Sequence, residues 1–212
     1  MNYKKYSGKA GDGMFRRQEE LIKTMTEKEL LWNLLITQSL ILLAFIILSF
    51  IFFDHGGEFL RFWQFDVYEI VVFGGLTACF VIIIDFILMK FANKQLYDDG
   101  GINEKLFQNR SLFAIFSITL LVAFTEELLF RGLLQTELGI FWASIIFALL
   151  HFRYLSKWLL LIMVLFVSFL LGCLFEATEN LLAVIMAHFL IDFISALEIR
   201  YSLFHNRSDG WE

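Results

Sequence analysis

The sequence predicts an all-α protein, a polytopic transmembrane bundle of about six spans, N-in and C-in. The first observation is composition, because the 212 residues are 58% hydrophobic and only 18% charged, against about 45–50% and about 25% in soluble domains. A soluble domain of this size could not bury so much apolar surface. The second observation is a series of long apolar runs, and the third is the uneven distribution of Lys and Arg between them.

The run Leu30–Phe53 contains 24 residues without a charge, and a helix needs about 20 residues to cross the hydrocarbon core. Five further apolar segments follow, at about Val67–Phe91, Ser111–Thr136, Gly139–Tyr154, Trp158–Phe175 and Leu181–Ile199. Strands of a membrane β-barrel have about 10 residues and alternate in polarity. These runs are longer and do not alternate, so they predict helices.

The positive charges predict how the helices are oriented. Fifteen Lys and Arg residues lie in the N-terminal region, the second and fourth connections and the C-terminal tail, against Arg61 and Arg131 on the other side. Cytoplasmic loops carry the excess of Lys and Arg, so both termini are expected in the cytoplasm of a multi-pass cell-membrane protein whose first partner is the lipid bilayer. The net charge of −5 argues against a nucleic-acid partner.

The polar stretch Asn93–Arg110 divides the chain. We expect a cytoplasmic N-terminal tail at 1–29, two transmembrane helices and a cytoplasmic loop at 30–110, a four-helix core at 111–199 and a cytoplasmic C-terminal tail at 200–212.

The ionisable residues of interest within the last four spans are Glu126, Glu127, Arg131, His151, His188 and Asp192. A charged group at the bilayer centre costs about 3 kcal/mol or more, so each is a candidate functional residue. With a rise of 1.5 Å per residue, Glu126 and His151 both lie roughly 18–20 Å from a turn near Leu138–Gly139. This equal depth predicts that they face each other across a helical hairpin.

His188 and Asp192 are expected about 12 Å and about 18 Å below a turn near Glu179–Asn180, which lies on the same side of the membrane. Their i,i+4 spacing places both on one stripe of the last helix. Four titratable groups from three helices are therefore predicted to converge near the midplane.

The neighbouring residues predict structural support for such a site. Glu127 and Arg131 have the i,i+4 spacing of an ion pair, which leaves Glu126 free to point into a shared cavity. Phe147 lies one turn before His151 and can pack beside its imidazole. Glu126 with His151 could hold and deprotonate a water molecule.

Three motifs occur in order on successive apolar helices. Glu126–Arg131 reads E-E-x-x-x-R, Phe147–His151 reads F-x-x-x-H, and His188–Asp192 reads H-x-x-x-D. Over roughly Ser111 to Ile199 the chain resembles the CPBP family of intramembrane proteases, also called the Abi or CAAX-protease family. This family includes Rce1-type prenyl-protein endopeptidases and bacteriocin-immunity relatives.

The resemblance implies that Glu126 activates water with His151 as its partner, and that His188 and Asp192 help to form the oxyanion site. It implies a glutamate-dependent mechanism with no metal or other cofactor. Asp192 departs from the family, because Asn often stands at this position and an ionised Asp cannot donate to an oxyanion. Asp192 is then protonated, or orients His188, or the site binds a metal.

These observations predict an intramembrane endopeptidase acting on membrane-delivered peptide or protein substrates, such as processed secreted peptides, bacteriocin-like peptides or prenylated tails. Three alternatives stay open. One is a non-catalytic member that acts in bacteriocin immunity or binds a membrane partner such as a sensor kinase. The second is an ion or proton carrier, and the third is a zinc-dependent protease with Glu126, His151 and His188 as ligands.

Overall fold

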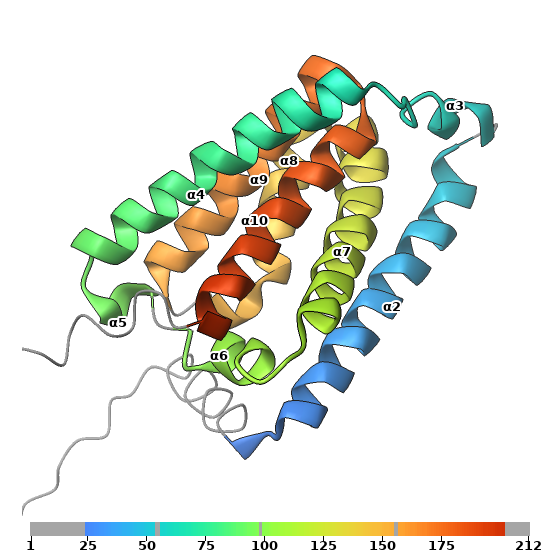
Figure 1. Cartoon of the computed structure of the whole chain (residues 1–212). Coiled ribbons are helices and arrows are strands. Elements are labelled where there is room, and N and C mark those ends of the chain that lie inside the picture. The colour runs from blue at the N-terminus through green and yellow to red at the C-terminus, as the bar shows by residue number, and fades with distance from the viewer. Residues whose placement is uncertain (1–23, 54–55, 98, 155–156, 202–212) are drawn as a thin grey trace, which may run out of the picture.

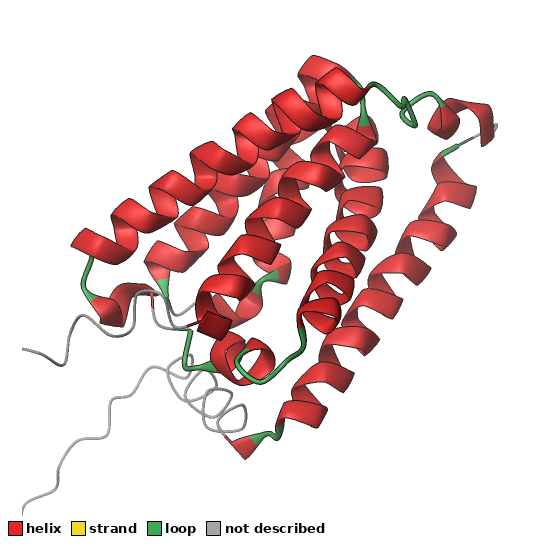
Figure 2. Cartoon of the chain, viewed as in Figure 1, coloured by secondary structure: helices red, strands yellow, loops and turns green. Residues whose placement is uncertain are grey.

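A computed structural model describes residues 24–53, 56–97, 99–154 and 157–201 of the chain. These residues form helices joined by short connections, with no strand among them (Figures 1 and 2). The all-α bundle expected from the sequence is therefore confirmed. Most of the two tails expected at 1–29 and 200–212 lies outside the described residues.

Twelve helical elements occur in the described part of the chain. In order they are α2 (Glu27–Phe52), α3 (Gly56–Leu60), the π-helical η1 (Glu69–Phe73), α4 (Gly74–Phe91), α5 (Lys94–Tyr97), α6 (Ile102–Phe107), α7 (Leu112–Leu129), the π-helical η2 (Phe130–Gln135), α8 (Thr136–Leu150), the 3-10 turn η3 (Phe152–Tyr154), α9 (Trp158–Thr178) and α10 (Leu181–Tyr201).

Local hydrogen bonds explain where two of the long helices begin. The Thr26 hydroxyl accepts from the backbone N–H of Glu29, and the Glu29 carboxylate accepts from the backbone N–H of Thr26 at 2.7 Å. This capping box starts α2 three residues before the apolar run. Ser111 caps α7 in a similar way, because its hydroxyl accepts from the backbone N–H of Ala114 at 3.2 Å.

Five of the described helical stretches are long and apolar enough to cross a membrane. The third stretch, Leu112–Leu150, has 39 residues and reverses direction at Gly139, where φ is 80° and ψ is 164°. The rings of Phe130 and Phe147 consequently lie 4.7 Å apart, whereas a straight helix would separate these positions by about 25 Å. The hairpin expected near Leu138–Gly139 is therefore present.

The second arm of this hairpin differs from the helix expected at Gly139–Tyr154. Its helix ends at Leu150, so the residues after Gly139 rise only about 16 Å as a helix. The chain continues through His151 and the short turn η3. Irregular backbone at membrane depth occurs where it is buried in protein or lines a hydrated space, and His151 lies at this interruption.

The long helices pack around α10. It contacts α7, α4 and α9, whereas α2 lies at the edge of the bundle beside α7 (Figure 1). The approach of α4 to α10 depends on Gly74, where an added Cβ would stand 2.7 Å from the backbone oxygen of Ala183. Small residues allow such close helix contacts in membranes.

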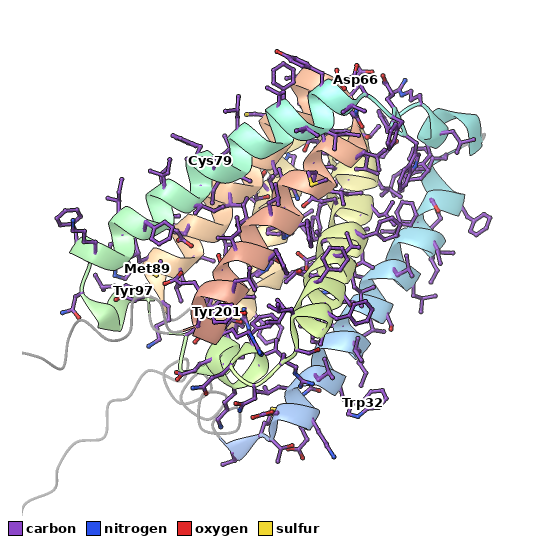
Figure 3. The ribbon with its side chains drawn as sticks, viewed as in Figure 1. Trp32, Asp66, Cys79, Met89, Tyr97 and Tyr201 are labelled. Carbon is purple, nitrogen blue, oxygen red and sulfur yellow. The ribbon has the colours of Figure 1, made fainter. Side chains whose placement is uncertain are left out.

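The two ends of the described chain lie at the same end of the bundle. Asp66 lies at one end of the bundle, and Tyr97 and Tyr201 lie at the other (Figure 3). Leu30 near the start of α2 packs against α6, which also contacts α10. A chain that crosses the membrane an even number of times must have both ends on the same side, as is found here. Arg131, which the charge pattern assigned to the side opposite the termini, is instead buried inside the bundle.

Candidate functional site

Glu127 is the centre of a buried polar network that joins α7 to α10. Its side chain is fully enclosed. One oxygen lies 3.1 Å from Arg131 Nε, as expected from the i,i+4 spacing. The other lies 2.6 Å from His188 Nδ1, a contact that the sequence did not predict. The carboxylate thus has a cationic partner on its own helical segment and an imidazole partner on another helix.

Arg131 connects the network to α8 and α9. Its Nη2 donates to the backbone oxygen of Ser168 at 2.8 Å and lies 3.1 Å from the Ser168 hydroxyl. The guanidinium lies over the ring of Phe147, 5.1 Å from its centre. A buried charge is tolerated only with such partners. Through these contacts Arg131, which lies in η2, joins that segment to α7, α8 and α9.

A local widening of the helix presents these residues. After Glu127 the chain passes from α-helix into η2, and the backbone N–H of Phe130 donates to the carbonyl oxygens of both Glu126 and Glu127. Single π-helical turns inside helices are frequent at functional sites. Here the π-helical segment carries Arg131, so it sets the direction from which the guanidinium reaches Glu127.

His188 lies between two carboxylates. Its Nδ1 faces Glu127, and its Nε2 lies 3.5 Å from an oxygen of Asp192. Both ring nitrogens can serve two carboxylates only as donors, which is the imidazolium form. Among the three roles left open for Asp192, this position favours orientation of His188. The side chain of Asp192 is also the more exposed of the two.

Glu126 has a different environment from its neighbour. It is buried, and its Oε1 accepts from the Gln38 amide at 3.1 Å. Gln38 belongs to α2, and its own amide oxygen accepts from the hydroxyl of Thr125. Gln38 is neutral, so the pattern of charged residues in the spans does not reveal it. The available signal was an amide side chain deep within the apolar run Leu30–Phe53, where Asn33 and Gln38 are the two amides.

Within the described residues no direct hydrogen bond or ion pair joins Glu126 and His151, so their expected partnership around a water molecule stays a prediction. His151 Nδ1 instead lies 2.8 Å from the backbone oxygen of Phe147, one turn earlier. Their rings are 4.6 Å apart, which confirms the expected packing. Equal depth therefore did not produce direct contact, because a local bond holds the imidazole against its own helix.

That local bond also assigns the protons of His151. A carbonyl oxygen only accepts, so Nδ1 carries a proton, and in the neutral imidazole Nε2 is then the acceptor. In the described part of the chain, no three His, Cys, Asp or Glu side chains come close enough to hold a metal ion. The set Glu126, His151 and His188, named as ligands for a zinc-dependent enzyme, is not gathered in this structure.

A second group of polar contacts lies away from the motifs. The Asn180 amide donates to Glu69 at 2.9 Å, and the Gln135 amide donates to the backbone oxygen of Gly172 at 2.9 Å. These bonds hold η1 against the α9–α10 turn and η2 against α9. They involve none of the motif residues, so we interpret them as structural.

The comparisons with known proteins agree with this fold and these motifs. Residues 108–194 match the family model described as type II CAAX prenyl endopeptidase Rce1-like. The chain is 49% identical over 173 residues to the uncharacterized protein YpbD of Bacillus subtilis (strain 168), which covers 82% of this chain and 90% of that protein. No solved structure matches the chain.

The fold and the matches thus define a helical membrane protein with a CAAX-type protease fold. The chain belongs to the Rce1-like CAAX protease family. The matched segment contains Glu126, Glu127, Arg131, Phe147, His151, His188 and Asp192, but Gln38 precedes it.

Proposed function

We propose that this protein is an intramembrane endopeptidase of the cell membrane, in which Glu126 activates the water that attacks the peptide bond. The observation that carries the proposal is that two adjacent buried glutamates have different partners. Glu127 is held by Arg131 and His188. Among the described residues Glu126 has only the neutral amide of Gln38 as a side-chain hydrogen-bond partner, so its carboxylate is the one left to accept a proton.

The second oxygen of Glu126 supports this role. None of the hydrogen bonds within the described residues involves Oε2. Oε2 is therefore the oxygen of Glu126 that is left to accept a hydrogen bond from water.

The reaction that we propose is hydrolysis with balanced proton transfers. Glu126 takes a proton as water oxygen bonds to the carbonyl carbon, and His151 Nε2 accepts a hydrogen bond from the same water. The contact of His188 Nε2 with Asp192 is 3.5 Å, longer than a normal hydrogen bond. In the reaction this Nε2–H, oriented by Asp192, donates to the oxygen that becomes negative. Glu126 then returns its proton to the amine nitrogen as the carbon–nitrogen bond breaks, which leaves an acid and an amine.

The substrates that we propose are peptides or proteins delivered through the bilayer. Large apolar side chains cover the outside of the bundle, including those of Phe50, Phe91 and Phe113, so lipid surrounds the site. The matching family model is described by its action on prenylated C-a-a-X tails. A prenylated tail is therefore the first substrate class to test.

The decisive experiment compares peptide termini in cell membranes. Cells that lack the natural gene receive the wild type, Glu126→Gln or Glu137→Gln, where Glu137 is an exposed glutamate in the same hairpin. Mass spectrometry of new termini should find a set that disappears with Glu126→Gln and persists with Glu137→Gln. If an equally abundant Glu126→Gln protein leaves every terminus and the cellular phenotype unchanged, the endopeptidase is refuted and the non-catalytic alternative is supported.

Purified protein in lipid vesicles then tests the substrate class. The probe is an internally quenched, S-farnesylated peptide that ends in a C-a-a-X sequence, and the same peptide without the farnesyl group is its control. Loss of a general base lowers kcat by about 10²- to 10⁴-fold, and this is the loss expected for Glu126→Gln. Loss of activity in chelator with recovery on adding Zn²⁺ would instead support the metal-dependent alternative.

A further inference from the structure

Gln38 is an unusual residue for its helix. α2 lies at the edge of the bundle (Figure 1) and exposes most of its large apolar side chains, among them Trp32 and Phe50. Figure 3 shows Trp32 projecting away from the other helices. Among the 26 residues of α2 only Leu30 and Gln38 are buried. An amide in the apolar interior costs free energy unless it is hydrogen-bonded, so its partners are the reason that this position is tolerated.

Both ends of the Gln38 amide are held by adjacent residues of α7. The Nε2 group donates to Glu126 Oε1 at 3.1 Å, and the Oε1 atom accepts from the Thr125 hydroxyl. The Thr125 hydroxyl also lies 2.9 Å from the backbone oxygen of Leu121, but it has one proton and donates it to Gln38, because an ionised Glu126 can only accept and the amide N–H must face it. With its oxygen facing Thr125, the amide has one orientation, and the orientation points an N–H at Glu126.

This contact distinguishes the two carboxylate oxygens of Glu126. Oε1 accepts from the Gln38 amide, whereas no described hydrogen bond reaches Oε2, so Oε2 is the oxygen with both lone-pair sites open to water. A general base must lie within hydrogen-bond reach of the proton that it takes, and small misplacements of reacting groups cost large factors in rate. We propose that Gln38 is a positioning residue, supplied by α2, that aims the Glu126 carboxylate at the attacking water.

The proposal rests on the proposed function for its catalytic meaning, and it extends the active unit beyond the matched segment 108–194. In this arrangement α2 also supplies a side chain to the active site. It brings one neutral donor to a carboxylate that no described cation contacts. A merely structural role is the competing explanation, because polar side chains also join neighbouring helices in membranes.

An infrared experiment separates these two explanations without any substrate. The full-length protein in lipid vesicles gives a Glu126 carboxyl band, assigned by its loss in Glu126→Gln. The test variant is Gln38→Met, which keeps an unbranched side chain of similar length but removes the donor. Its matched control is Gln135→Met, which removes another buried amide that donates to Gly172 and Glu176.

The Glu126 band should shift in Gln38→Met and stay in place in Gln135→Met. Thr125→Val should shift it in the same direction, because the amide loses its orientation, whereas Thr37→Val should not, since the Thr37 hydroxyl bonds only within α2. An unshifted band in a folded Gln38→Met protein overturns the proposal.

A kinetic arm uses the farnesylated quenched peptide. Gln38→Met should lower kcat by about 10- to 100-fold with KM unchanged within about twofold, while Gln135→Met should lower the unfolding temperature and leave kcat unchanged. A rise in KM with unchanged kcat contradicts a positioning role. If the wild type hydrolyses nothing but the infrared band still shifts in Gln38→Met, the proposed endopeptidase fails while the Gln38–Glu126 contact stands.

Discussion

Replacing Arg131 with Met removes the positive charge that faces Glu127 in the middle of the bundle. The substitution deletes the ion pair at 3.1 Å, two contacts to Ser168 at 2.8 Å and 3.1 Å, and the cation contact with the Phe147 ring. Leaving one member of a buried ion pair without its partner costs about 3–5 kcal/mol. Glu127 keeps His188 at 2.6 Å, so we expect a loss of about 3 kcal/mol in the free energy of unfolding.

Combining Arg131→Met with Glu127→Gln should recover part of this loss. No charge is then left buried without a partner, and replacing both members of a buried pair is often close to neutral. The double variant is therefore expected to be more stable than Arg131→Met alone. The matched control is Arg61→Met, because Arg61 is exposed and surface substitutions change stability by about 0.5 kcal/mol or less.

The assay is SDS-driven unfolding in mixed micelles, followed by circular dichroism of the helices. All four proteins are compared at one lipid-to-detergent ratio. The reasoning is refuted if Arg131→Met unfolds within about 1 kcal/mol of the wild type, since a desolvated Glu127 then carries no penalty. It is also refuted if the double variant is no more stable than Arg131→Met alone.

Three further predictions concern packing, backbone and chemistry. Gly74→Ala should lower the free energy of unfolding by about 1–3 kcal/mol because its Cβ meets the Ala183 oxygen, whereas Gly75→Ala has open space and should be neutral or slightly stabilising in the same SDS titration. Gly139→Ala should lower the free energy of unfolding by about 1–2 kcal/mol, because Gly139 has a positive φ. No clash contributes, since no atom lies within 4 Å of the new Cβ. A variant as stable as the wild type would contradict a strained turn. Asp192→Asn should keep kcat within about tenfold of the wild type, since the amide oxygen of Asn can accept from His188. Asp192→Leu should lower kcat by about 10²-fold. Equal kcat values for these two variants in the vesicle assay would exclude an orienting role for Asp192.

The sequence predicted those parts of the molecule that depend on neighbours along one helix. Apolar runs identified the long helices, because hydropathy over about 20 residues is decided locally. The i,i+4 spacing predicted the Glu127–Arg131 pair, and the same spacing predicted that Phe147 packs beside His151. The hairpin was predicted because two apolar segments meet at a turn near Leu138–Gly139.

Depth alone did not predict which side chains meet. The rise per residue determines how far Glu126 and His151 lie below their shared turn, but the rotation of each helix about its axis determines where each side chain points. In the structure His151 bonds to the Phe147 backbone and Glu126 bonds to Gln38. The shortened α8 was also missed, because the apolar character of the segment continues past the residue at which its helix ends.

By itself, the sequence determined the class of protein, its membrane helices and the local pairs within each helix. These depend on composition and on short spacings, which the chain specifies before any helices pack. Only the tertiary structure decided that Glu127, and not Glu126, contacts His188, and that an amide from α2 contacts Glu126. Such contacts join residues 61 and 88 positions apart, and they arise from how rigid helices rotate against one another, which no spacing within a single helix encodes.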